Sequence, residues 1–156
     1  MNSSGTQTDG TAWNLAINGN QNVTYVDTKD SNASTGSIVT QTNSTNSGNN
    51  TNWTVPTVNA GADKTTTASF YTVANGSSAT STNSAIATYL WTYTTTGAGT
   101  VTFQSPFTLD TLVSATTGTY TIRQTAADLG GFSNYDELNL VWSGAGGGGG
   151  GGGGAP

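Results

Sequence analysis

The acidic residues are the side chains of this sequence that are best suited to catalysis or metal binding. Eight Asp and Glu stand against three Lys and Arg, the formal net charge is −5, and there is no His and no Cys. Without His, the chain lacks the commonest general base and the commonest transition-metal ligand. Without Cys, it forms neither a disulfide framework nor a thiolate zinc site. The carboxylates therefore remain as the main candidates for metal binding or acid–base chemistry.

Calcium is the metal that these carboxylates would suit. It takes about six to eight oxygen ligands from carboxylates, carbonyls and water, which polar loops can supply. Asp27 and Asp30 share one loop, and other acids lie where one end of a β-sandwich could gather them. However, no Asp-x-Asp-x-Asp spacing occurs, and turns favour Asp for backbone reasons alone. We therefore expect solvated loop acids and no cofactor, and the calcium alternative rests on Asp63, Asp128 and Asp136.

The acids do not form a convincing catalytic pair. A glycosidase needs two carboxylates about 5–9.5 Å apart across a cleft. Asp136 and Glu137 are adjacent on an expected strand, so their side chains point to opposite faces. No Ser or Thr has a His to activate it, and neither lysine lies in an obvious apolar pocket. We expect that the chain is not an enzyme.

The charge and composition also limit the partners and the compartment. Three basic residues are too few for phosphate recognition, so no nucleic-acid partner is expected. No apolar run approaches the length of a membrane span, so no membrane insertion is expected. Only 7% of residues are charged, while Thr, Asn, Ser and Gly are abundant. Such a hydroxyl-rich composition is typical of extracellular β proteins, so we expect this chain at a cell surface or in a virion.

The elements that must position these residues are β-strands. Tyr89, Trp91 and Tyr93 recur at period two, as in a strand with one face on a core. A turn-rich stretch, 94–99, then leads into a second alternating run. The expected fold class is all-β, with a sandwich core that contains Tyr89, Trp91, Phe103, Tyr120, Ile122, Leu138 and Leu140.

Residues 12–53 form a separate β-rich segment of short alternating runs and Asn-rich turns. The stretches Trp-Asn-Leu-x-Ile-Asn-Gly and Asn-Val-Thr-Tyr-Val-Asp-Thr-Lys resemble the last coils of the right-handed parallel β-helices of bacterial and phage surface proteins. The resemblance implies short stacked strands with an edge that a neighbour must cover. A few irregular strands packed beside the sandwich remain the alternative.

Residues 54–142 carry the clearest resemblance. Pro56 marks the expected boundary, because proline removes a ladder donor and restricts the residue before it. The run Pro-Thr-Val-Asn-Ala-Gly-Ala-Asp, the strand with Trp91, the stretch Gly-Thr-Tyr-Thr-Ile-Arg and the stretch Asp-Leu-Gly-Gly resemble a PKD-type immunoglobulin-like domain. The Asp-Phe-Gly-Asp turn of the best-known members is absent. Tyr120 is a candidate tyrosine corner, with its hydroxyl bonded to an upstream backbone group.

The two ends complete the expected organisation. Residues 1–11 are polar and are expected to be a flexible N-terminus. Residues 143–156 contain nine consecutive glycines. Such a run loses too much conformational entropy to order alone, so a flexible Gly-rich linker or tail is expected, and packing of glycine strands between chains is the alternative.

The expected function follows from these features together. We expect a non-enzymatic structural module of a surface layer, filament or virion, acting in assembly, spacing or decoration. Its partners would be copies of itself or other surface or virion proteins, because the N-terminal segment has little charge to repel a neighbouring edge. The alternative is a glycan-binding adhesin module in which Trp13 or Trp53 stacks on a sugar ring.

Overall fold

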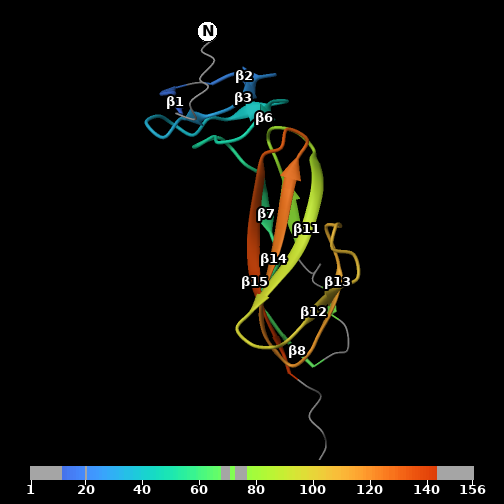
Figure 1. The fold of residues 1–156 in the computed structure, drawn as a ribbon. Coiled ribbons are helices and arrows are strands. Elements are labelled where there is room, and N and C mark those ends of the chain that lie inside the picture. The colour runs from blue at the N-terminus through green and yellow to red at the C-terminus, as the bar shows by residue number, and fades with distance from the viewer. Residues whose placement is uncertain (1–11, 20, 68–70, 73–76, 144–156) are drawn as a thin grey trace, which may run out of the picture.

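The computed structural model describes residues 12–19, 21–67, 71–72 and 77–143, and every helix or strand element in these ranges is a β-strand. The expectations for residues 1–11 and for the glycine run lie outside the described residues. Figure 1 shows a small stack of short strands at one end of a long sandwich. No helix in the described ranges is long and apolar enough to cross a membrane.

The N-terminal segment consists of coils stacked in parallel. The first coil holds β1 (Trp13–Asn14), β2 (Val23–Thr24) and β3 (Asp27–Thr28), and the second holds β4 (Ser31–Asn32), β5 (Gln41–Thr42) and β6 (Thr45–Asn46). Each strand pairs in parallel with its counterpart, in the pairs β1–β4, β2–β5 and β3–β6. The parallel pairing implied by the β-helix resemblance is therefore present.

The coils repeat with an offset of 18 residues, the separation at which Val26 N–H donates to the Ser44 hydroxyl. The backbone repeats along with the strands. Tyr25 and Asn43 occupy equivalent corners with φ of 52° and 48°, and both lie in the left-handed region. A third, partial coil follows, in which Thr51 bridges to Asn32 and Trp53 bridges to Val39 in parallel. The segment therefore has two full coils and part of a third.

The strands that follow the coils form a sandwich with two main sheets. One has four strands in the order β11 (Ile86–Thr95), β14 (Gly118–Asp128), β15 (Ser133–Trp142) and β8 (Lys64–Thr66). The other has three strands in the order β12 (Val101–Phe103), β13 (Leu112–Ala115) and β9 (Tyr71–Thr72). A separate antiparallel pair joins β7 (Thr57–Asn59) to β10 (Ser78–Thr80). In the four-stranded sheet, β15 pairs in parallel with β8 and the other pairs are antiparallel.

The two sheets enclose one apolar core. Alternate residues of the long strands point inward, as period two requires. Five of the seven expected core residues are buried in this cluster: Trp91, Tyr120, Ile122, Leu138 and Leu140. Phe103 is partly buried against them. Tyr89 is half-buried and lies outside the cluster.

Tyr120 has the geometry expected of a tyrosine corner. Its hydroxyl donates to the Thr116 carbonyl, four residues upstream, at 2.7 Å, and it lies 2.9 Å from the Thr116 hydroxyl. Its ring meets Tyr93 edge to face, with centroids 6.1 Å apart. Burial of a phenol is favourable when its hydroxyl finds a partner, as it does here. The described chain is an all-β protein with an immunoglobulin-like sandwich, as predicted.

Candidate functional site

Among the described residues, nothing covers the outer end of the first coil. Four apolar side chains of this coil point into the stack, and they are only partly buried: Leu15, Ile17, Val23 and Val26. Below them, Ala33 and Val39 of the second coil are fully buried. The apolar side chains of the interior are therefore more completely buried in the second coil than in the first. A stack of coils buries its core between neighbours, so the last coil at an end exposes apolar surface unless something covers it.

The backbone of the first coil is open at the same end. Leu15 N–H donates to the Asn32 carbonyl at 2.9 Å, and Tyr25 N–H donates to the Thr42 carbonyl at 3.1 Å. Successive residues of a strand direct their backbone groups to opposite neighbours. Asn14 and Thr24, which adjoin these donors, therefore direct their N–H and C=O groups away from the second coil. We call this row, together with the four apolar side chains, the open coil end.

The other end of the coil stack rests on the sandwich. Trp53 is 7% exposed and stacks on Phe132, with ring centroids 6.4 Å apart and an interplanar angle of 24°. Phe132 is fully buried in one cluster with Ala33 and Val39. It comes from the turn between β14 and β15, so the sandwich supplies an aromatic side chain to the core of the coils. Figure 1 shows the coils at the end of the sandwich opposite β8.

A buried hydrogen-bond network centred on Asp128 supports the contact. The Asp128 carboxylate accepts from the N–H groups of Gly130 and Phe132, at 2.9 and 3.1 Å. It also accepts from the Ser81 hydroxyl at 2.8 Å and from the Asn83 amide at 3.2 Å. A carboxylate that receives several donors is held in one orientation, and the turn around it is held too. Asp128 therefore shapes the surface on which the coils rest.

Asn83 links this hydrogen-bond network to the second coil. Its amide donates to the Ser44 carbonyl at 2.9 Å, and its side-chain oxygen accepts from Ser44 N–H at 2.8 Å. Asn46 N–H donates to the Gly130 carbonyl at 2.7 Å. A Cβ on Gly130 would lie 2.0 Å from the Ser44 carbonyl oxygen, so only glycine permits this approach. This contact, which we call the coil–sandwich junction, occupies the lower end of the coils.

Most of the contacts in the coil–sandwich junction are not predicted by the sequence. The sequence places Asp128 and Gly130 within the sandwich and makes Asp128 a calcium candidate, and it does not single out Asn83 or Phe132. An Asp two residues before a glycine does indicate a tight turn, and Gly130 N–H does bond back to Asp128. However, the partners of that turn come from residues far away in the sequence, and no local pattern predicts them.

The three calcium candidates are not brought together. Asp128 is buried in the junction, while the Asp136 carboxylate accepts from Ala60 N–H at 3.0 Å. The Asp63 carboxylate accepts from Asn139 N–H at 2.7 Å. The three contacts are spread along β15, from the turn before it to the residue near its far end. Within the described ranges, no group of three or more acids lies close enough to hold a metal ion.

Asp63 gives the protein an acid-sensitive contact. Hydrogen bonds from the Asn139 backbone and then from its side chain lower the Asp63 pKa from its ordinary value of 3.8. A carboxyl whose folded pKa is lowered stabilises the folded state above its unfolded pKa, and that stabilisation is lost as pH falls through the folded pKa. We expect Asp63→Asn to reduce the loss of stability that occurs as the pH falls below the ordinary pKa of 3.8.

Urea unfolding of the parent and of the Asp63→Asn variant above and below this pH measures the effect. The two curves of unfolding midpoint against pH should converge at the acid end. Parallel curves would show that the Asp63 carboxylate does not contribute to the acid sensitivity.

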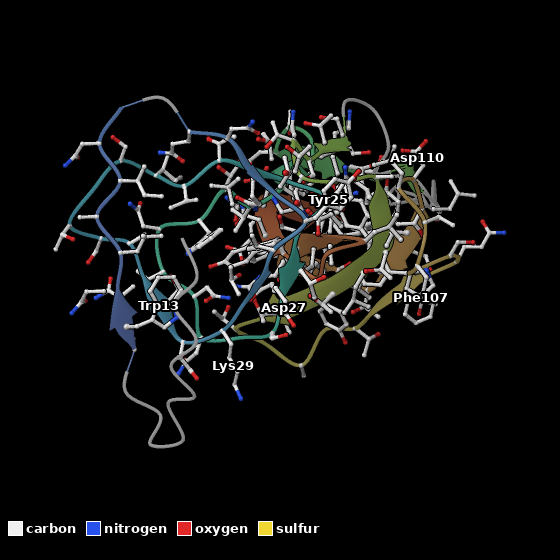
Figure 2. The ribbon with its side chains drawn as sticks, turned by 90° about the horizontal axis from the view of Figure 1, so that it is seen from above. Trp13, Tyr25, Asp27, Lys29, Phe107 and Asp110 are labelled. Atoms are coloured by element: carbon white, nitrogen blue, oxygen red, sulfur yellow. The ribbon has the colours of Figure 1, made fainter. Side chains whose placement is uncertain are left out.

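The alternative of a glycan-binding module depended on an exposed Trp13 or Trp53, and the structure places these two tryptophans in different environments. Trp53 is buried against Phe132, so the expectation that it is exposed is wrong. Trp13 is half-buried, and its indole N–H donates to the Lys29 carbonyl at 2.8 Å. Figure 2, which looks down on the coils, places Trp13 on the side away from the sandwich and Tyr25 above the sandwich.

Two further exposed aromatic side chains lie on the sandwich. Tyr135 stands on the outer face of β15, and the Arg123 guanidinium lies 3.9 Å from its ring centroid. Arg123 also forms an ion pair with Glu137 at 2.6 Å. This ion pair keeps the guanidinium in place over the Tyr135 ring face. Phe107 is 72% exposed on the loop between β12 and β13. Figure 2 shows Phe107 and Asp110 on the side of the sandwich away from Trp13.

The fold defines a class of protein: a short stack of parallel coils carried on an immunoglobulin-like sandwich. No family model matches the chain, and no curated protein matches it either. Among solved structures, the chain is similar to the PKD domain from KIAA 1837 protein, known from a solution structure, with a TM-score of 0.45 and 23% sequence identity. The match covers 55% of this chain and 84% of that one.

Proposed function

We propose that this chain is a non-enzymatic structural module of an extracellular surface layer, filament or virion, and that it assembles through its open coil end. The observation that carries the proposal is the open coil end itself. It joins a parallel edge that no described residue pairs to apolar side chains that are only partly buried, and both features favour a covering partner. The low charge and the hydroxyl-rich composition support a place outside the cell.

The partner that we propose is a second copy of the same chain. The lower end of the coils is occupied by the third coil and by the coil–sandwich junction, so a copy has no free end on which to stack head to tail. Two open coil ends can still meet each other, and such a contact uses the same surface on both copies. An interface of this kind closes at two copies. The sandwiches would then project in opposite directions.

Light scattering on the full-length chain tests the proposal. At high protein concentration the expected mass is twice the 15.7 kDa of one chain, and it falls toward one chain on dilution. Ile17→Lys puts a charge among the apolar residues of the open coil end. Its long stem can reach solvent while the end is uncovered, but the charge is buried when the end is covered. The variant should remain a monomer.

The matched control is Ile38→Lys, because Ile38 is 54% exposed on the second coil. This variant should dimerise like the parent, and melting curves of both variants report whether they are folded. A parent that stays monomeric at every concentration would contradict self-assembly. A dimer that Ile17→Lys leaves unchanged would place the interface elsewhere.

A further inference from the structure

Tyr25 is an exposed aromatic residue in a backbone conformation that does not suit it. Its side chain is 80% exposed at the corner between β2 and β3, and its φ of 52° lies in the left-handed region. That region disfavours bulky residues, whereas Asn tolerates it through local hydrogen bonds. The equivalent corner of the second coil holds Asn43. Neither the ladder nor the apolar interior requires a tyrosine here, and residues held in disfavoured conformations cluster at binding sites.

A hollow lies directly below this corner, where the second coil meets the sandwich. Its volume is about 220 Å³, and it is lined by Asn43, Ser44, Thr45, Ser84, Leu129 and Gly130. The parallel register places Thr24 opposite Thr42 and Asp27 opposite Thr45, so Tyr25 stands one strand above Asn43. Adjacent strands are about 4.8 Å apart. The Tyr25 side chain and the hollow are therefore within reach of one small ligand.

The side chains around the hollow are suited to a particular chemistry. Asn43 and Thr45 are exposed, and they offer an amide and a hydroxyl, each of which both donates and accepts. Leu129 adds an apolar surface that is 73% exposed. Two carboxylates lie beside the described lining: Asp128 accepts from Gly130 N–H, and Asp27 accepts from the Ser47 hydroxyl. A neutral ligand with hydroxyl groups and an apolar face matches this set, and an anion does not.

We propose that the hollow beneath Tyr25, lined by Asn43, Thr45 and Leu129, binds a neutral saccharide. The C–H face of a pyranose ring packs on the Tyr25 ring, as apolar groups pack on aromatic faces. The sugar hydroxyls bond to the Asn43 amide and the Thr45 hydroxyl. Binding sites combine a few such polar groups with apolar walls in a concave surface. Another exposed tyrosine, Tyr135, has its ring face covered by Arg123, whereas no cation of the described residues lies over the Tyr25 ring.

Tyr25→Asn is the direct test, because it copies the residue at the same corner of the second coil. The full-length parent, applied to an array of neutral and anionic oligosaccharides, should bind a subset of the neutral ones. Titration of the best-bound oligosaccharide should then show saturation. Tyr25→Asn should weaken this binding by about tenfold or more through loss of the aromatic contact. Its melting temperature should stay the same or rise, because Asn relieves the backbone strain.

Phe107→Ala is the matched control, because it removes an equally exposed aromatic side chain far from the hollow. This control should bind like the parent. The proposal is overturned if no neutral oligosaccharide binds, if only anionic ones bind, or if Tyr25→Asn binds as tightly as the parent. These results are independent of assembly, because the hollow is formed within one copy and Tyr25 points away from the coil interior.

Discussion

Replacement of Trp91 by alanine is expected to lower the free energy of unfolding by about 3–5 kcal/mol, the range for deleting a large buried aromatic side chain. Trp91 is 2% exposed at the centre of the sandwich core and stacks with Phe103, with ring centroids 6.4 Å apart. It also has a second role. Its indole N–H donates to the Thr108 carbonyl at 3.0 Å and so anchors the loop that carries Phe107. The variant therefore loses both a core side chain and a loop contact.

Trp91→Phe separates these two roles. It keeps most of the apolar volume but removes the indole N–H, which leaves the Thr108 carbonyl without this donor. A loss of about 1–3 kcal/mol is expected for Trp91→Phe, well below the loss for alanine. Urea unfolding of the full-length variants gives both values. A Trp91→Ala variant within about 1 kcal/mol of the parent would show that the core is not centred on this residue.

Replacement of Asp128 by alanine is the second large effect, with an expected cost of roughly 2–6 kcal/mol. The variant takes the carboxylate acceptor from two buried N–H groups, at about 1–3 kcal/mol each. Phe132 N–H loses this acceptor, and Gly130 N–H keeps only a longer bond of 3.3 Å to the Ser84 hydroxyl. The loss also extends into the coils. Asn83, which holds Ser44, loses one of its own partners, and the turn that presents Phe132 to Trp53 is released. Residues on both sides of the junction should therefore become less protected from amide exchange.

Asp110→Ala serves as the control for Asp128. The Asp110 carboxylate accepts from the Ser77 hydroxyl at 3.0 Å in an exposed position. Surface substitutions of this kind change stability by within about 0.5 kcal/mol. If Asp128→Ala costs no more than Asp110→Ala, then the buried network does not hold the junction together. If the cost is large but protection is lost in the sandwich alone, then the coils are stable without the junction.

The core of the sandwich could be predicted from the sequence because its signal is local. Trp91, Ile122 and Leu138 each lie on a strand with alternating apolar residues, and period two fixes the face that turns inward. Tyr89 shows where this reasoning fails. It has the right period and lies in the first half of β11, but it is not part of the core cluster. Alternation predicts the face of a strand and not the extent of the core along it.

The junction and the corner hollow could not be predicted in this way. The glycan-binding alternative took Trp53 as an exposed residue, but Phe132, which comes from the distant turn between β14 and β15, covers it. The Tyr25 corner depends on a repeat of 18 residues in which the side chains change from coil to coil. The backbone repeats there, while the sequence hardly does. The domain boundary at Pro56 stays a prediction, although the coil pairing ends at Trp53 and β7 begins at Thr57.

Amide exchange at the first coil tests the central claim, assembly through the open coil end, most directly. Tyr25 N–H is bonded to the second coil in every copy, so it should exchange slowly at all protein concentrations. Thr24 N–H points away from that coil and has no acceptor among the described residues, and a second copy that covers the edge would supply one. The account predicts that Thr24 becomes protected at high concentration and loses this protection on dilution. Rapid exchange of Thr24 in a sample that light scattering shows to be dimeric would contradict it.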